Sequence, residues 1–101
     1  MITLRVNDDD LSILTEGHAN YAEKGKDIVC AAVSILLNTY AAELLRLGDI
    51  PQIRDEENSY DIRPEAAMEK AKPAFETIRS GLRLLSEVYK KYVRLEETKN
   101  E

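Results

Sequence analysis

Residues 27–48, DIVCAAVSILLNTYAAELLRLG, contain the longest apolar run of the chain and predict a long helix. Asp27 is a suitable N-cap, because its side-chain oxygens can accept hydrogen bonds from the unpaired amides of the first turn. Gly48 marks the end of the helix, after about Leu47, because glycine readily adopts the left-handed conformation that terminates helices. The first half is apolar on nearly every side, so we expect it to be deeply buried. A stripe at helical spacing comprises Val29, Val33, Leu36, Tyr40, Leu44 and Leu47.

The segment before this helix predicts a β-hairpin followed by a loop. Residues 2–6 alternate apolar and polar side chains, which is the period of a half-buried strand. A polar turn at 7–10 separates them from a second strand at 11–16. Residues 17–26, GHANYAEKGK, follow neither the helical nor the strand period, and glycines near both ends indicate a loop.

The segment after the helix predicts a second hairpin. Residues 50–55 and 60–63 are weaker strand candidates around a polar turn at 56–59. Pro51 cannot donate a hydrogen bond to a sheet, so we expect it at the start of its strand or on a sheet edge.

The C-terminal part predicts a second helix and a final strand. Apolar residues from Met68 to Leu85 recur in steps of three and four, which indicates an amphipathic helix. Pro73 falls inside this pattern and predicts a kink or a later helix start. Residues 92–96 could form the last strand. The order strand-strand-helix-strand-strand-helix-strand predicts an α+β fold, with two long helices packed on a small, mainly antiparallel sheet.

The composition is that of a single globular domain spanning residues 1–101. The chain is 44% hydrophobic and 33% charged, which is ordinary for a domain of this size. Its 19 acidic and 14 basic residues give a net charge of -5, which disfavours nucleic acid and favours a basic or neutral partner. One cysteine cannot form an intramolecular disulfide, so we expect a reducing, cytoplasmic location. The N-terminus does not resemble a signal peptide, and no uninterrupted apolar run could span a bilayer, so we expect no membrane partner.

The single histidine and the single cysteine flank the loop that leads into the long helix. If Asp27 caps that helix, Cys30 lies in its first turn, where the helix dipole favours a thiolate nucleophile. The unpaired amides of this turn could also bind the oxyanion of a tetrahedral intermediate. His18 could fold over the helix start as the general base, and Ser34 lies one turn after Cys30 on the same face.

The stretch from Gly17 to Ser34 contains every chemically distinctive residue of the chain. It closely resembles the signature of the ribosomal-processing cysteine protease family called Prp, and the match continues more loosely through Leu36 and Thr39. Outside this stretch the chain follows the layout of the family only as a pattern. The matching residues are Gly17-His18-Ala19, Tyr21-Ala22, Gly25 and Asp27-Ile28-Val29-Cys30-Ala31-Ala32-Val33-Ser34.

The resemblance implies a function, and it implies roles for named residues. Enzymes of this family remove a short N-terminal extension from large-subunit ribosomal protein twenty-seven, cutting after an aromatic pair. The resemblance also implies that the chain forms a homodimer. Carried onto this chain, the resemblance implies Cys30 as nucleophile and His18 as base, with Asp27 and Ser34 in supporting positions. The implied partners are the extension of that ribosomal protein and a second copy of the chain.

Two alternatives stay open beside a protease. A lone cysteine in an apolar helix is most often a small core residue, and a lone histidine in a polar loop is most often solvated. The chain could therefore be a noncatalytic binding module of ribosome assembly or a thiol redox sensor. One histidine and one cysteine are too few for a dedicated zinc site, so we expect no metal and no cofactor.

Residues 17–26 also predict a mobile flap that carries the base. The segment has no periodic apolar face, and Gly17 and Gly25 are candidate hinges. Closure over a bound peptide would bring His18 within reach of Cys30. The alternative is a fixed turn whose glycines only satisfy local geometry.

Overall fold

The computed structural model describes residues 1–23, 26–66 and 68–98. Its helices and strands follow the order expected from the sequence, with boundaries that differ by one or a few residues. In chain order they are β1 (Ile2–Asn7), β2 (Ser12–Gly17), α1 (Ile28–Arg46), β3 (Gln52–Glu56), β4 (Ser59–Arg63), α2 (Met68–Val88) and β5 (Val93–Thr98).

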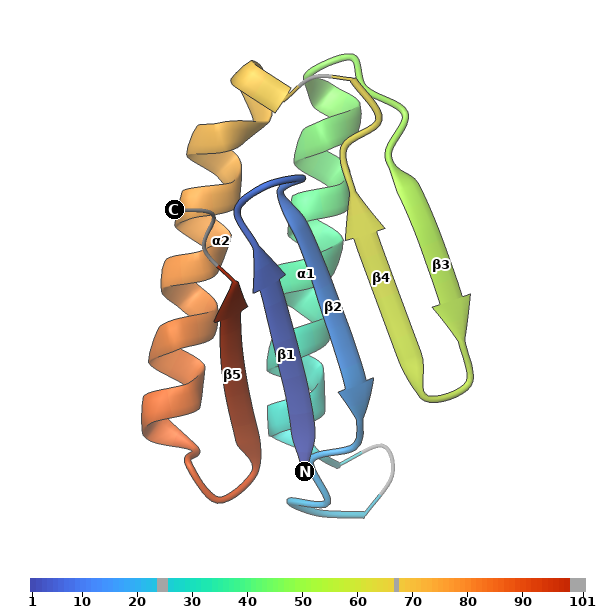
Figure 1. Cartoon of the computed structure of the whole chain (residues 1–101). Helices are drawn as coiled ribbons and strands as arrows, with labels where there is room; N and C mark the ends of the chain where they lie inside the picture. The colour runs from blue at the N-terminus through green and yellow to red at the C-terminus, as the bar shows by residue number, and fades with distance from the viewer. Residues whose placement is uncertain (24–25, 67, 99–101) are drawn as a thin grey trace.

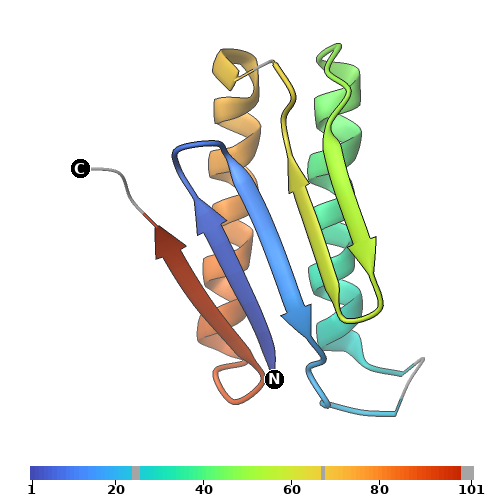
Figure 2. The same ribbon diagram turned by 45° about the vertical axis from the view of Figure 1, so that its right-hand side comes forward.

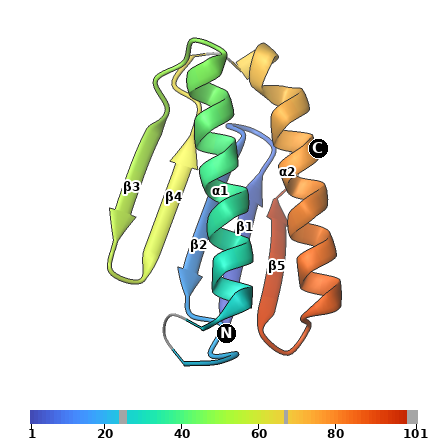
Figure 3. The ribbon, with the colours of Figure 1, turned by 180° about the vertical axis from the view of Figure 1, so that it is seen from behind.

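The strands form one five-stranded sheet in the order β3-β4-β2-β1-β5 (Figure 1). Neighbouring strands are antiparallel except for β1 and β5, which are parallel. Both helices lie on the same face of the sheet, as the turned view and the view from behind show (Figures 2 and 3). The predicted α+β fold, with two helices on a mainly antiparallel sheet, is confirmed.

The two faces of β1 account for this two-layer arrangement. Ile2, Leu4 and Val6 are at most 3% exposed, and they form the floor of the core under the helices. Arg5 points the opposite way and forms ion pairs with Glu16 on β2 and Glu96 on β5, at 2.6 and 3.4 Å. Alternation of apolar and charged side chains therefore leaves one sheet face to the helices and the other to water.

The cap and the end of α1 lie where the sequence predicts them. The first half of the helix, however, is not buried on every side as expected. Asp27 is the N-cap, and Gly48 has a φ of +87° just beyond the C-cap Leu47. Ile28 and Ile35 are 55% and 62% exposed, because α1 packs on the sheet and α2 and turns its remaining side to solvent. The buried residues of this helix are Val29, Val33, Leu37, Tyr40, Ala41 and Leu44.

The apolar character of α1 extends beyond its uninterrupted apolar run. Among the described residues it is the one helix whose length and composition would allow it to cross a membrane, with a mean hydropathy of 1.8. Residues buried in the protein make up 33% of that segment. Core helices of soluble proteins commonly have the same length and apolar composition.

Tyr40 fixes the middle of α1 to the sheet. Its side chain is fully buried, and its hydroxyl donates a hydrogen bond of 2.7 Å to the carbonyl oxygen of Leu11. Leu11 lies in the turn between β1 and β2 with a φ of 57°, a strained value for leucine. Burial is the main cause that raises the pKa of Tyr40, so the hydroxyl stays a donor.

Pro73 does not delay the start of α2. The helix runs through it from Met68, so the predicted later start is wrong. The proline is exposed, so the carbonyl group that loses its helical partner there can bond to water. The hydroxyl of Thr77 donates a hydrogen bond of 3.0 Å to the carbonyl oxygen of Pro73 and ties the next turn to it.

Candidate active site

The site forms where the end of β2, the start of α1 and the turn between β3 and β4 come together. Pairing of β2 with β4 places Glu16 opposite Ser59. The amide of Gly17 then donates a hydrogen bond of 2.9 Å to the carbonyl oxygen of Asn58. Gly17 has a φ of +85°, so the chain leaves the sheet sharply and the next residue, His18, faces α1.

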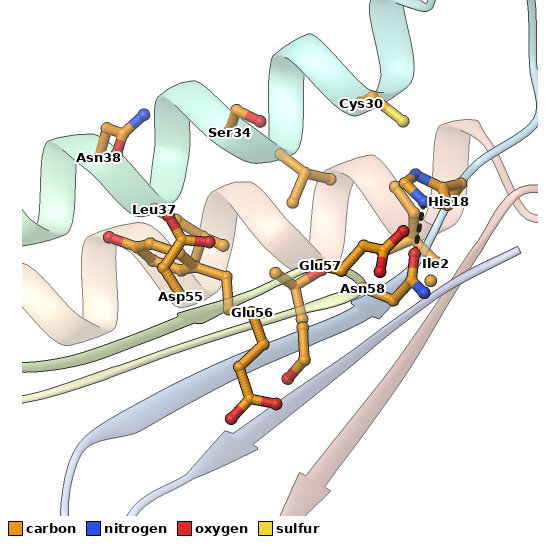
Figure 4. Close-up of a pocket in the computed structure, with 15 residues that line it drawn as sticks. Ile2, His18, Cys30, Ser34, Leu37, Asn38, Asp55, Glu56, Glu57 and Asn58 are labelled. Carbon is orange, nitrogen blue, oxygen red and sulfur yellow. Dashed lines mark hydrogen bonds between the residues drawn. The ribbon is translucent and has the colours of Figure 1, made fainter. Parts of the chain in front are cut away.

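His18, Cys30 and Ser34 line two neighbouring cavities, of about 350 and 540 Å³. The first lies between α1 and the β3–β4 turn, and Figure 4 shows the Cys30 sulfur on the side of this cavity where His18 lies. Cys30 is a partly buried free thiol, whereas His18 and Ser34 are exposed. The three residues expected at the site are therefore brought together, and a bound molecule could reach the thiol.

His18 has a hydrogen-bond partner that the sequence did not suggest. Its Nε2 atom lies 2.8 Å from the side-chain oxygen Oδ1 of Asn58. Asn58 belongs to the polar turn between β3 and β4, forty residues along the chain. In Figure 4 the other ring nitrogen of His18 is on the side of the ring that faces Cys30.

Asp27 organises the start of the helix through three backbone amides. Its Oδ1 accepts hydrogen bonds of 3.0 Å from Val29 and Cys30, and its Oδ2 accepts one of 3.0 Å from Tyr21. The hydrogen bond from the Cys30 amide is the main cause that lowers the pKa of Asp27 below 3.8. The carboxylate therefore remains ionised in the cap, next to the start of the helix that carries Cys30.

The same contacts correct the expected oxyanion site. The amides of Val29 and Cys30 bond to the Asp27 side chain, and the amide of Ala31 bonds to the Asp27 carbonyl oxygen at 3.1 Å. These three donors are thus occupied, so the proposal that they bind an oxyanion is wrong for this arrangement. Capping by Asp27 and oxyanion binding compete for the same hydrogens.

The loop before α1 is attached to the body at several described positions. Ala19 is 2% exposed and belongs to the core. The ring of Tyr21 packs edge-on against Tyr89 and Tyr92, with centroids 5.7 and 5.0 Å apart. Gly25, the second expected hinge, lies outside the described residues, so hinge roles for Gly17 and Gly25 stay predictions.

The walls of the first cavity include residues outside the stretch from Gly17 to Ser34 that carries the family resemblance. Acidic residues of the β3–β4 hairpin, at 55–57, line one side. Apolar side chains of Ile2, Val33 and Leu37 line the part between the sheet and α1. Among the described residues, no group of three or more His, Cys, Asp or Glu could hold a metal ion.

A cysteine in the first turn of a helix, with a histidine on the wall of the same cleft, is an arrangement that cysteine proteases use. A family model described as "Cysteine protease Prp" matches residues 1–94. The chain therefore belongs to the Prp family of cysteine proteases.

Solved structures and a curated relative agree with this membership. An essential ribosomal processing protease Prp from S. aureus, in complex with a covalently linked product peptide, superposes with a TM-score of 0.85 at 26% identity, covering 97% of this chain and 100% of that one. The same protein in complex with a substrate peptide gives a TM-score of 0.80 at 25% identity, covering the same shares. The ribosomal processing cysteine protease Prp of Mycoplasma genitalium is 52% identical over 31 residues, which is 31% of each chain.

Proposed function

We propose that this chain is a cysteine endopeptidase that removes a short N-terminal extension from large-subunit ribosomal protein twenty-seven, cutting after a pair of aromatic residues. The observation that supports this most is that His18 and Cys30 line one accessible cleft at the start of α1. Family membership and the two S. aureus complexes with peptides support the same reaction class.

In the proposed reaction His18 and Cys30 act as a dyad. His18 accepts the proton of the Cys30 thiol while the sulfur attacks the scissile carbonyl carbon. The carbon–nitrogen bond then breaks as His18 returns the proton to the leaving amine, and the extension stays bound to Cys30 as a thioester. Water hydrolyses the thioester and releases the extension.

The Ser34 hydroxyl is the proposed donor to the oxyanion, because it lines both cavities. The nearby helix amides are not available for this role, since Asp27 occupies them.

The shape and charge of the cleft fit a short, partly aromatic and partly basic peptide. Two cavities share the His18–Cys30–Ser34 wall, so the peptide can extend to either side of the scissile bond. Apolar walls of the first cavity suit an aromatic side chain. The acidic residues 55–57 favour a basic segment, such as the tail of a ribosomal protein.

The proposed active form is a cytoplasmic homodimer. The outward side of α1 exposes Ile28, Ile35 and Leu45, each more than half accessible, and a second copy of the chain would cover such a surface. Sedimentation equilibrium over a range of concentrations should give a dimer, and Ile35→Asp should shift it toward monomer. A wild-type chain that stays monomeric at high concentration contradicts this part of the proposal.

The test of the proposed function is cleavage of the extended ribosomal protein, followed by mass spectrometry of the new N-terminus. We expect one cut, directly after the aromatic pair, and loss of cleavage when both aromatic residues are changed to alanine. Alkylation of Cys30 should stop the reaction. The control variant Ser80→Ala, on the exposed face of α2, should cleave as wild type does. Binding of the ribosomal protein without cleavage would favour the binding module. Reversible oxidation of Cys30 without cleavage would favour the redox sensor.

A further inference from the structure

Asn58 holds the imidazole of His18 from the side away from Cys30. The Oδ1–Nε2 distance is 2.8 Å. The backbone of the same residue is fixed independently, because its carbonyl oxygen accepts the Gly17 amide at 2.9 Å. Asn58 is therefore anchored by the sheet to the residue directly before His18, while its side chain reaches the ring (Figure 4).

An amide oxygen can only accept a hydrogen bond, so this contact selects one protonation form of the neutral ring. Nε2 must carry the hydrogen that it donates to Oδ1. The other ring nitrogen, Nδ1, then has a free lone pair, and it is the nitrogen on the side of Cys30 in Figure 4. This is the tautomer that can accept the thiol proton.

We propose that Asn58 is a positioning residue for the general base, fixing both the tautomer and the orientation of His18. The proposal rests on the proposed function in one respect, the role of His18 as the base. When His18 takes up the thiol proton, both ring nitrogens become donors, and the Nε2–H bond to Asn58 persists. Asn58 can thus support the ring before and after proton transfer without adding charge to the site.

The size of the expected loss in kcat follows from the exposure of His18 and Asn58 to solvent. His18 and Asn58 are both exposed, so water can replace the lost contact in the free protein. We expect Asn58→Ala to lower kcat about 10-fold, the loss typical of one ordinary hydrogen bond. KM should change less than kcat, because the alanine variant removes the orientation of the base, whereas Asn58 is only one of the many residues that line the first cavity. Asn58→Asp keeps an acceptor oxygen, so it should restore most of kcat and move the acid limb of the pH–rate profile to higher pH.

Ring ¹⁵N chemical shifts of His18 test the tautomer directly, and the chain has one histidine, so the signals need no assignment by mutation. Wild type and Asn58→Asp should show the Nε2–H form of the neutral ring, and Asn58→Ala should show a mixture. The matched control is Asn7→Ala, which removes an amide oxygen that accepts the Asp9 amide at the far end of the first hairpin. It should leave both the ¹⁵N shifts and kcat unchanged.

The outcomes separate this inference from the proposed function. A wild-type ring with its hydrogen on Nδ1 overturns the role of Asn58, as does an Asn58→Ala variant with unchanged shifts and unchanged kcat. Either result leaves the dyad to be judged by cleavage. If His18→Ala cleaves as fast as wild type, the proposed role of His18 as base fails, and with it the positioning role of Asn58. If wild type cleaves nothing, the proposed function fails, while the tautomer measurement still reports whether Asn58 fixes the ring.

Discussion

Replacement of Gly17 by alanine should show how strictly the path of the backbone into the site is fixed. Gly17 has a φ of +85°, and a Cβ atom there would lie 2.6 Å from the carbonyl oxygen of Met1. Gly48 provides a matched control, because its φ is +87° but nothing lies within 4 Å of the corresponding Cβ position. The two alanine variants share the cost of the left-handed backbone and differ in the steric contact.

The expected magnitudes follow from these two terms. A left-handed conformation costs an L-residue about 1–2 kcal/mol, and alanine offsets about 0.4–1 kcal/mol of this by restricting the unfolded chain. Gly48→Ala should therefore lower the free energy of unfolding by about 1 kcal/mol. Gly17→Ala must also displace the backbone of Met1, at an overpacking cost of about 1–3 kcal/mol, for a total loss of about 2–4 kcal/mol.

Urea unfolding followed by circular dichroism measures both losses, provided that the two variants keep the wild-type m-value. Peptide cleavage at a temperature where both variants are folded adds the functional comparison. Gly17→Ala should also reduce kcat/KM, because Gly17 carries the hydrogen bond to Asn58 and directly precedes His18. Gly48→Ala should not. Equal losses of stability in the two variants would refute the reasoning, and so would a Gly17→Ala variant as stable as wild type.

Two further predictions concern groups outside the proposed dyad. Tyr40→Phe removes the hydrogen bond to the Leu11 carbonyl oxygen and should lower the free energy of unfolding by about 1–3 kcal/mol, because a buried acceptor loses its donor. A urea titration indistinguishable from wild type would contradict this. Because hydrogen bonding lowers the pKa of Asp27 below 3.8 in the folded protein, its stabilising effect is present above the unfolded value and is lost as pH falls through the folded value. Asp27→Asn should therefore make the free energy of unfolding less dependent on pH around and below 3.8. An unchanged pH dependence in the variant would argue against this role of Asp27.

Local sequence signals were sufficient for the elements and for the cap of α1. Asp27 and Gly48 act within a turn of the helix ends, so their roles depend on few distant contacts. The exposure of Ile28 and Ile35 could not be predicted in the same way. It depends on both helices lying on one sheet face, which is a property of the whole fold.

The site illustrates the same limit. His18, Cys30, Asp27 and Ser34 lie within one stretch of sequence, and the family resemblance pointed to them. Asn58 lies in a polar turn without any functional signal, and it reaches His18 only because β2 pairs with β4 in a particular register. The oxyanion expectation failed for a local reason, since the Asp27 cap uses the amides that it required.

The central claim, a Cys30–His18 dyad, is tested most directly by kcat/KM for cleavage of the extended ribosomal protein by wild type, Cys30→Ala, His18→Ala and the double variant. Both residues act in one chemical step, so each single variant should lose cleavage and the double variant should be no worse than either. Circular dichroism should show that all variants are folded. Cleavage at the wild-type rate by either folded single variant would contradict the dyad.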